Sequence, residues 1–100
     1  MNKIPTEFSL QGHPIKVNMY DEIENGLFGD YDCAKEVIRI AKNIRRDSEL
    51  IPLNETQIMA SFIHEFIHAL QWHSGHEFSE IEAQTYSGMI IEFLNTRKYE

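Results

Sequence analysis

The residues with the clearest chemical potential are two histidines and a glutamate in the segment His64-Glu65-Phe66-Ile67-His68. Residues four apart on an α-helix lie about 40° from each other around the axis, so His64 and His68 would project from one face. Glu65 would lie about 100° from His64, within reach of a water on a shared metal ion. A zinc hydrolase needs this arrangement. We therefore predict that both histidines bind one zinc ion and that Glu65 is the general base.

The sequence around this segment predicts a helix over about 54–73. Asn54 is a candidate N-cap, and Gln57 stands three residues later, where it would complete a capping box. Gly75 follows the last predicted turn and is typical of a helix end. Apolar side chains recur at helical spacing and would line the buried face: Ile58, Phe62, Phe66, Ala69 and Leu70.

A catalytic zinc usually has three protein ligands and one water, so a third ligand is needed. A second helix is predicted over about 79–95, with Ser79 as its N-cap. Its predicted buried stripe is apolar: Ala83, Tyr86, Met89, Ile90 and Phe93. Glu82 would lie on this stripe, where an unpaired carboxylate is costly, although an acid in a first turn also complements the helix dipole. We predict Glu82 as the third ligand, with Glu80 as the alternative.

Other metal ligands fit this pattern less well. In metzincins a third histidine lies six residues after the second, but that position is Ser74 here. His73 is one residue short and would point away from the other two histidines. His76 follows the predicted turn and could swing back toward the metal. Cys33 could ligate zinc as a thiolate, but a lone cysteine beside a strand is more often buried filler.

The first half of the chain has the pattern of β-structure. Four segments alternate apolar and polar residues or are rich in β-branched residues: 6–10, 14–20, 27–31 and 36–41. The first two would pair as a hairpin, whereas a helix over 33–42 competes with the last strand. Residues 43–53 are charged and would connect the two halves. These patterns predict an α+β fold, with a small N-terminal antiparallel or mixed β-sheet packed on the helix at 54–73 and on the second helix at 79–95.

The composition is typical of one globular domain. The chain has 100 residues, of which 42% are hydrophobic, so we predict a single domain over 1–100. Its net charge of −7 argues against nucleic-acid binding, which needs clustered Lys and Arg. The first seven residues lack the apolar segment of a signal peptide, and no apolar run is long enough to cross a membrane. A single cysteine fits a reducing compartment, so we predict a cytoplasmic protein.

The motif and the second helix together resemble the gluzincin metallopeptidases, above all the minigluzincins and the ImmA/IrrE-type peptidases. In these families the second helix carries a Glu-Ala-x-x-(Phe/Tyr)-(Ala/Ser) pattern, and Glu82-Ala83-Gln84-Thr85-Tyr86-Ser87 is similar to it. The resemblance covers roughly residues 54–95. It implies a zinc-dependent peptidase in which His64, His68 and Glu82 bind one zinc ion and Glu65 is the general base.

The resemblance also implies how a substrate would bind. In related peptidases the peptide lies extended along an edge strand beside the active helix, and Glu36–Ala41 is the candidate edge here. No motif identifies the residue that stabilises the oxyanion. The candidates are His76, Tyr86 and His13.

An alternative function remains open: a catalytically weak or self-inhibited zinc-binding or regulatory module of the same fold. In that case His76 would close the site as a fourth ligand, or the tail Asn95–Glu100 would cover the cleft.

Overall fold

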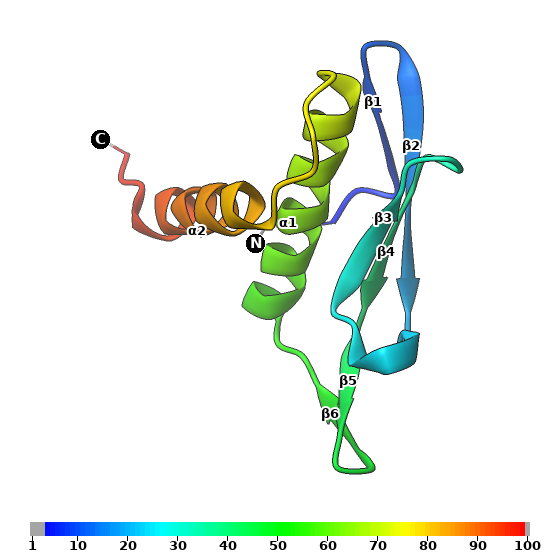
Figure 1. Ribbon diagram of the computed structural model, residues 1–100. Helices are drawn as coiled ribbons and strands as arrows, with labels where there is room; N and C mark the ends of the chain where they lie inside the picture. Colours follow the sequence, from blue (N-terminus) through cyan, green and yellow to red (C-terminus); the bar gives the residue numbers. More distant parts are fainter. Residues whose placement is uncertain (1–3, 100) are drawn as a thin grey trace.

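The computed structural model describes residues 4–99, which form a small mixed β-sheet, a β-hairpin and two helices (Figure 1). The elements follow one another along the chain as β1 (Glu7–Leu10), β2 (His13–Tyr20), the 3₁₀ turn η1 (Glu24–Gly26), β3 (Gly29–Asp32), β4 (Val37–Ala41), β5 (Asn43–Arg46), β6 (Glu49–Pro52), α1 (Glu55–His73) and α2 (Glu80–Thr96). This arrangement confirms the predicted α+β fold, including a strand rather than a helix at 37–41. Neither α1 nor α2 is long and apolar enough to cross a lipid bilayer.

The main sheet has the strand order β1-β2-β4-β3. β1 and β2 form the predicted antiparallel hairpin, β4 runs parallel to β2, and β3 pairs antiparallel with β4. The prediction that Glu36–Ala41 forms a free edge is therefore wrong, because β4 lies between two strands and β3 is the edge. Ile38 and Ile40 are fully buried on β4. Their alternation with polar residues is the same on a central strand as on an edge strand, so the pattern could not separate the two.

A second sheet consists of β5 and β6, which project beyond the main sheet as a hairpin (Figure 1). The predicted simple connection over 43–53 is wrong here. Asp47 and Ser48 both adopt positive φ, 50° and 68°, as two-residue hairpin turns require. Ile44 is the only buried residue of the two strands, so the hydrophobic pattern was too weak to reveal them.

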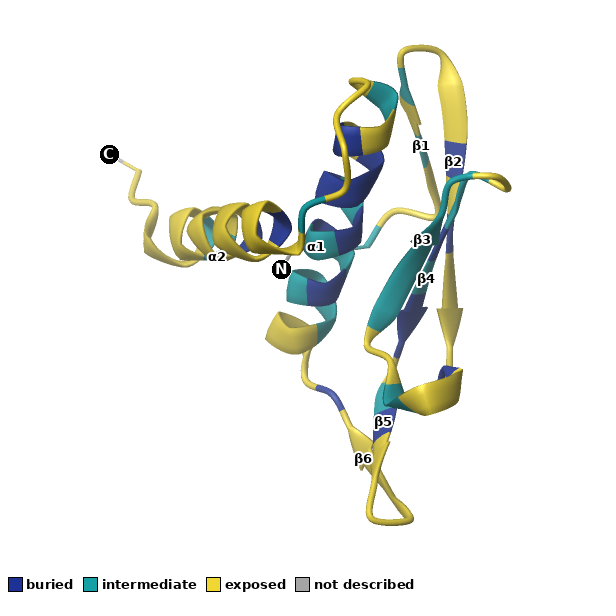
Figure 2. Ribbon diagram, in the orientation of Figure 1, coloured by how far each residue is buried: buried dark blue, intermediate teal, exposed yellow. Residues whose placement is uncertain are grey.

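The core lies between the sheet and α1, which covers one sheet face (Figure 2). Its buried members are apolar side chains from β2, β4 and α1: Ile15, Val17, Ile38, Ile40 and Ala69. Phe8 of β1 meets Phe62 and Phe66 of α1 edge-on, with ring centroids 6.1 and 5.1 Å apart. Fully burying one isoleucine stabilises a fold by about 1.5–3 kcal/mol, so this layer fixes α1 on the sheet.

Both predicted helix caps are present. The Asn54 side chain accepts a hydrogen bond from the Gln57 backbone N–H at 2.8 Å, and the Gln57 side chain accepts one from the Asn54 N–H at 2.9 Å. The Ser79 hydroxyl accepts from the Glu82 N–H at 3.1 Å. These local bonds begin α1 and α2 within one residue of the predicted positions.

The predicted buried stripe of α2 is confirmed only at Ala83 and is wrong for its other four residues. α2 packs on α1 through Ala83, which contacts Ile63 and Ile67, and then points away from the sheet (Figure 1). Most of α2 is exposed (Figure 2). Tyr86 and Phe93, both assigned to the stripe, are 46% and 63% exposed. The face that packs on α1 is thus a different side of the helix from its most apolar side.

We predict opposite effects for alanine at two glycines. A Cβ at Gly29 on β3 would lie 2.7 Å from the Arg39 carbonyl oxygen, whereas one at Gly88 on α2 would meet nothing within 4 Å. Gly29→Ala should therefore lower the free energy of unfolding by about 1–3 kcal/mol. Gly88→Ala should raise it by about 0.5–1 kcal/mol, because glycine weakens a helix interior. Urea denaturation measures both, and a fully stable Gly29→Ala protein would contradict the β3–β4 packing.

Candidate metal centre

A cavity of about 880 Å³ opens between β3, α1 and the first turns of α2. His64, Glu65 and His68 of α1 all line it. The rings of His64 and His68 lie edge to face with centroids 4.9 Å apart, as predicted for residues one turn apart on one helix face. The two imidazoles and the glutamate therefore share one space that a small ligand can enter.

Glu80, the first residue of α2, completes this group of ligands. Its Oε2 lies 3.3 Å from Nε2 of His64, and its Oε1 lies 2.5 Å from Nε2 of His68. Two atoms that bind one tetrahedral zinc ion are about 3.4 Å apart. The distance from Glu80 to His64 already matches this separation. The distance from Glu80 to His68 is that of a charge-assisted hydrogen bond, and it would have to lengthen by about 1 Å for both atoms to bind one zinc ion. Because the Glu80 side chain is 77% exposed, it is free to make this adjustment.

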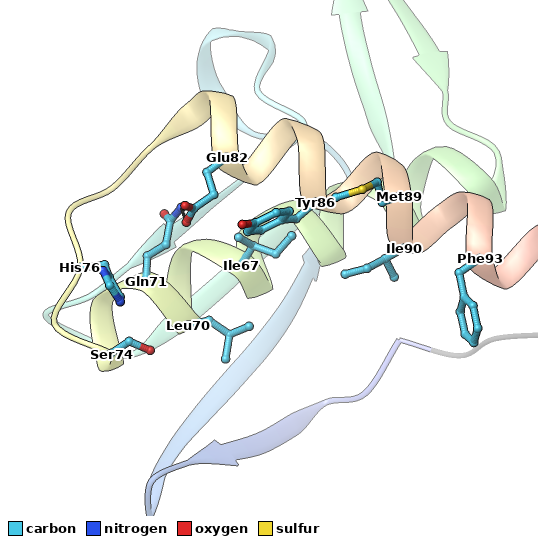
Figure 3. A pocket seen from close by; sticks show the side chains of 10 residues that line it. All are labelled: Ile67, Leu70, Gln71, Ser74, His76, Glu82, Tyr86, Met89, Ile90 and Phe93. Carbon is cyan, nitrogen blue, oxygen red and sulfur yellow. Dashed lines mark hydrogen bonds between the residues drawn. The ribbon is translucent and has the colours of Figure 1, made fainter.

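Glu82 is placed differently from the prediction. Its Oε1 accepts a hydrogen bond from Nε2 of Gln71 at 2.8 Å, and it lines a smaller, separate cavity of about 380 Å³. Figure 3 shows the Gln71 and Glu82 side chains pointing toward one another there. The alternative third ligand, Glu80, thus lies with the histidines, whereas Glu82 lies in the hydrogen-bond network around Gln71.

The physical reason for this difference is the orientation of α2. Ala83 and Ser87 are its buried residues, and Ile91 and Leu94 extend the same line at helical spacing. Glu80 precedes Ala83 by three residues and continues this packed face toward the cavity. Glu82 lies about 200° from Glu80 around the helix and points elsewhere.

Gln71 fixes the tautomer of His68. Its amide nitrogen donates to Oε1 of Glu82 and to the Ser79 carbonyl oxygen, and its amide oxygen accepts from the Ser79 N–H. The amide is thereby oriented with its oxygen 2.9 Å from Nδ1 of His68, which must then carry the proton. Nε2 of His68 faces Glu80 and is the ring nitrogen that a metal ion could bind in place of a proton. The spacing of three residues between His68 and Gln71 is a signal that could have revealed this pair.

Glu65 is 8% exposed and lies against Gly29 of β3. Burial raises the pKa of the Glu65 carboxyl to about 7; His68 opposes this rise, and the charges of Glu80 and Asp30 add to it. A dication held by the histidines would favour the ionised form. In the metal-free protein the Glu65 carboxyl group therefore changes its protonation state near neutral pH, and a bound dication would move that change to lower pH.

The three residues named for the oxyanion do not line this cavity. His76 and Tyr86 line the smaller cavity with Glu82 (Figure 3), and His13 lies near His73. No residue from 95–99 is among those that line either cavity, and Glu100 lies outside the described residues. Cys33 is half-buried and belongs to neither group of candidate ligands within 4–99.

Two glutamine substitutions separate the ligand from the supporting residue. Glu80→Gln removes the carboxylate nearest the histidines and should weaken zinc binding by more than about 100-fold. Glu82→Gln keeps an oxygen for Gln71 and should weaken it by at most about 10-fold. Both residues lie in the first turn of α2, so each variant loses a similar helix-dipole interaction. Competition with a zinc chelator gives both affinities, and the reverse ranking would restore Glu82 as the ligand.

The comparisons with known proteins do not assign a family. No protein-family model, curated protein sequence or solved structure matches this chain. A function must therefore be inferred from the side chains that line the cavity.

Proposed function

We propose that this protein is a zinc-dependent peptidase in which His64, His68 and Glu80 hold one zinc ion and Glu65 is the general base. The observation that carries the proposal is the convergence of three ligand atoms from two helices, all within 4.8 Å of one another. Two imidazoles and one carboxylate are the donor set of many catalytic zinc sites. Glu65 lines the same cavity, next to this group.

The donor set fits a catalytic zinc site better than a closed structural one. Structural zinc is usually held by four protein ligands, most often with cysteines among them. Of the described residues, three ligands converge at this site. His76, the fourth ligand that a closed site would use, lines the other cavity. This observation favours the peptidase over the non-catalytic zinc-binding module.

When bound, zinc would acidify a water molecule and polarise the carbonyl oxygen of the substrate. Glu65 would accept the proton of the attacking water and pass it to the departing amine. Its buried position keeps bulk water from competing for that proton. Gln71 would hold the His68 ring in its orientation, and the Gln71 amide is itself hydrogen-bonded to Glu82 and Ser79. The chain's own contribution is thus orientation and proton transfer.

We further propose that Gln84 stabilises the oxyanion. Several other polar side chains around the cavity are already hydrogen-bonded: Tyr31 to His73, Gln57 to Asn54, Ser61 to the Gln57 carbonyl, and Ser87 to the Gln84 carbonyl. Gln84 follows Glu80 by four residues and so lies about 40° from it, on the cavity side of α2. Its amide N–H is well placed to donate to a charge that develops beside the metal.

The substrate we propose is an extended peptide on β3. This strand pairs with β4 on one side, is the edge of the sheet on the other, and lines the cavity. A peptide added to that edge would bind through backbone hydrogen bonds and pass in front of His64 and Glu65. The proposed substrate-binding edge is therefore Gly29–Asp32 and not Glu36–Ala41, the segment that the sequence suggested.

Glu65→Gln tests this function directly. The amide cannot accept a proton, so kcat/KM on an unstructured protein substrate should fall by about 10²–10⁴-fold while zinc content is unchanged. Gln84→Ala should lower kcat, also without loss of zinc. The matched control is Glu92→Gln, an exposed position on α2, which should keep full activity. Undiminished hydrolysis by zinc-loaded Glu65→Gln protein, or none by the zinc-loaded wild type, would overturn the proposal.

A further inference from the structure

A second group of metal-type ligands lies away from the cavity. His13 at the start of β2, Glu36 in the turn before β4 and His73 at the end of α1 bring their ligand atoms within 4.8 Å of one another. These residues are far apart in the sequence, but their elements end toward the same end of the molecule (Figure 1). We propose that they form a second binding site for a divalent transition-metal ion of the zinc class.

The distances suit one shared ion. Oε1 of Glu36 is 3.3 Å from Nδ1 of His13 and 3.9 Å from Nε2 of His73. Two ligands of one tetrahedral zinc ion are about 3.4 Å apart, so the first pair already has this spacing. The Glu36–His73 pair must shorten by about 0.5 Å, which a small rotation of the 29% exposed Glu36 carboxylate would supply, and the 57% exposed His13 side chain can follow it. The carboxylate is central, and each imidazole needs only a small movement.

The surroundings hold this group in place. The His73 side chain is only 9% exposed, and its Nε2 is 3.2 Å from the Tyr31 hydroxyl. This hydrogen bond orients the His73 ring. Glu36 is tied to β2 through a 3.1 Å hydrogen bond from the Lys16 N–H to its carbonyl oxygen. The partly buried Glu36 and His73 thus form a fixed base for the exposed His13.

The chemistry of the donors selects the ion. Two imidazoles and one carboxylate favour zinc, nickel or cobalt over magnesium and calcium, which prefer all-oxygen sites. The ring centroids of His13 and His73 are 5.0 Å apart, so both imidazoles lie on the same side of the molecule as the Glu36 carboxylate.

This site is separate from the one that the proposed peptidase uses. His73 follows His68 by five residues on α1, which places it about 140° around the axis and about 7.5 Å along it. No residue is shared between the two ligand groups. The second ion would join the start of β2, the β3–β4 turn and the end of α1, so we assign it a stabilising role.

Zinc stoichiometry of the untagged full chain tests the second site. After equilibrium dialysis at low micromolar free zinc, elemental analysis should give two zinc ions for the wild type and one for His64→Ala/His68→Ala. Adding His13→Ala to that double variant should remove the remaining zinc, and Glu36→Gln should act in the same way. His13 is an exposed side chain, so its removal should leave the thermal midpoint in chelator unchanged.

His76→Ala is the matched control for unspecific binding by an exposed histidine, and should still bind two ions. In the His64→Ala/His68→Ala background, zinc should also raise the thermal midpoint, and this rise should vanish with His13→Ala. The second site is overturned if the double variant binds no zinc or if its zinc is insensitive to His13→Ala. That result would leave the peptidase proposal intact, because zinc binding at the first site is measured separately, in the wild-type and His13→Ala proteins, where His64 and His68 are present.

Discussion

Helix α1 has to meet three neighbours at once, and the rest of the structure depends on this constraint. Ala69 lies in the core against the sheet, Ile63 and Ile67 pack on α2, and His64 and His68 face the cavity. Rotating the helix by one residue, about 100°, would turn the two histidines away from the cavity and move the apolar side chains out of the core. The apolar packing of α1 therefore fixes the direction of both histidines.

The same packing puts a carboxyl group where it is costly. Glu65 is buried beside Gly29, and its pKa rises to about 7 because burial disfavours the charge. A cation in front of it would offset that cost, and a catalytic base near neutral pH would make use of it. Behind the histidines, Gln71 and Glu82 hold the His68 ring with its Nε2 toward Glu80. In the proposed site, Glu80 would bind the metal, Glu65 would act as the base, and Glu82 would orient Gln71.

Local features could be predicted from the sequence, whereas pairings over long range could not. The cap at Asn54 and the histidine pair depend on neighbours within four residues, so their geometry follows from the helix alone. The third ligand depends on which side of α2 meets α1. The more apolar side of α2 is exposed, so a prediction based on its apolar residues favoured Glu82, whereas Glu80 is the residue that lies beside the histidines. The strand order of the sheet could not be predicted either, because the alternation of apolar and polar residues along 36–41 does not show whether one or two strands lie beside this strand.

Diffraction from crystals of the zinc-loaded protein at the zinc absorption edge would locate the metal ion. We expect an anomalous peak in the cavity, about 2.0–2.2 Å from Nε2 of His64, Nε2 of His68 and a carboxylate oxygen of Glu80. Glu65 should lie beside this peak without contacting it directly. An anomalous map with no peak between the two histidines, or with the peak bound to Glu82 in place of Glu80, would contradict the account.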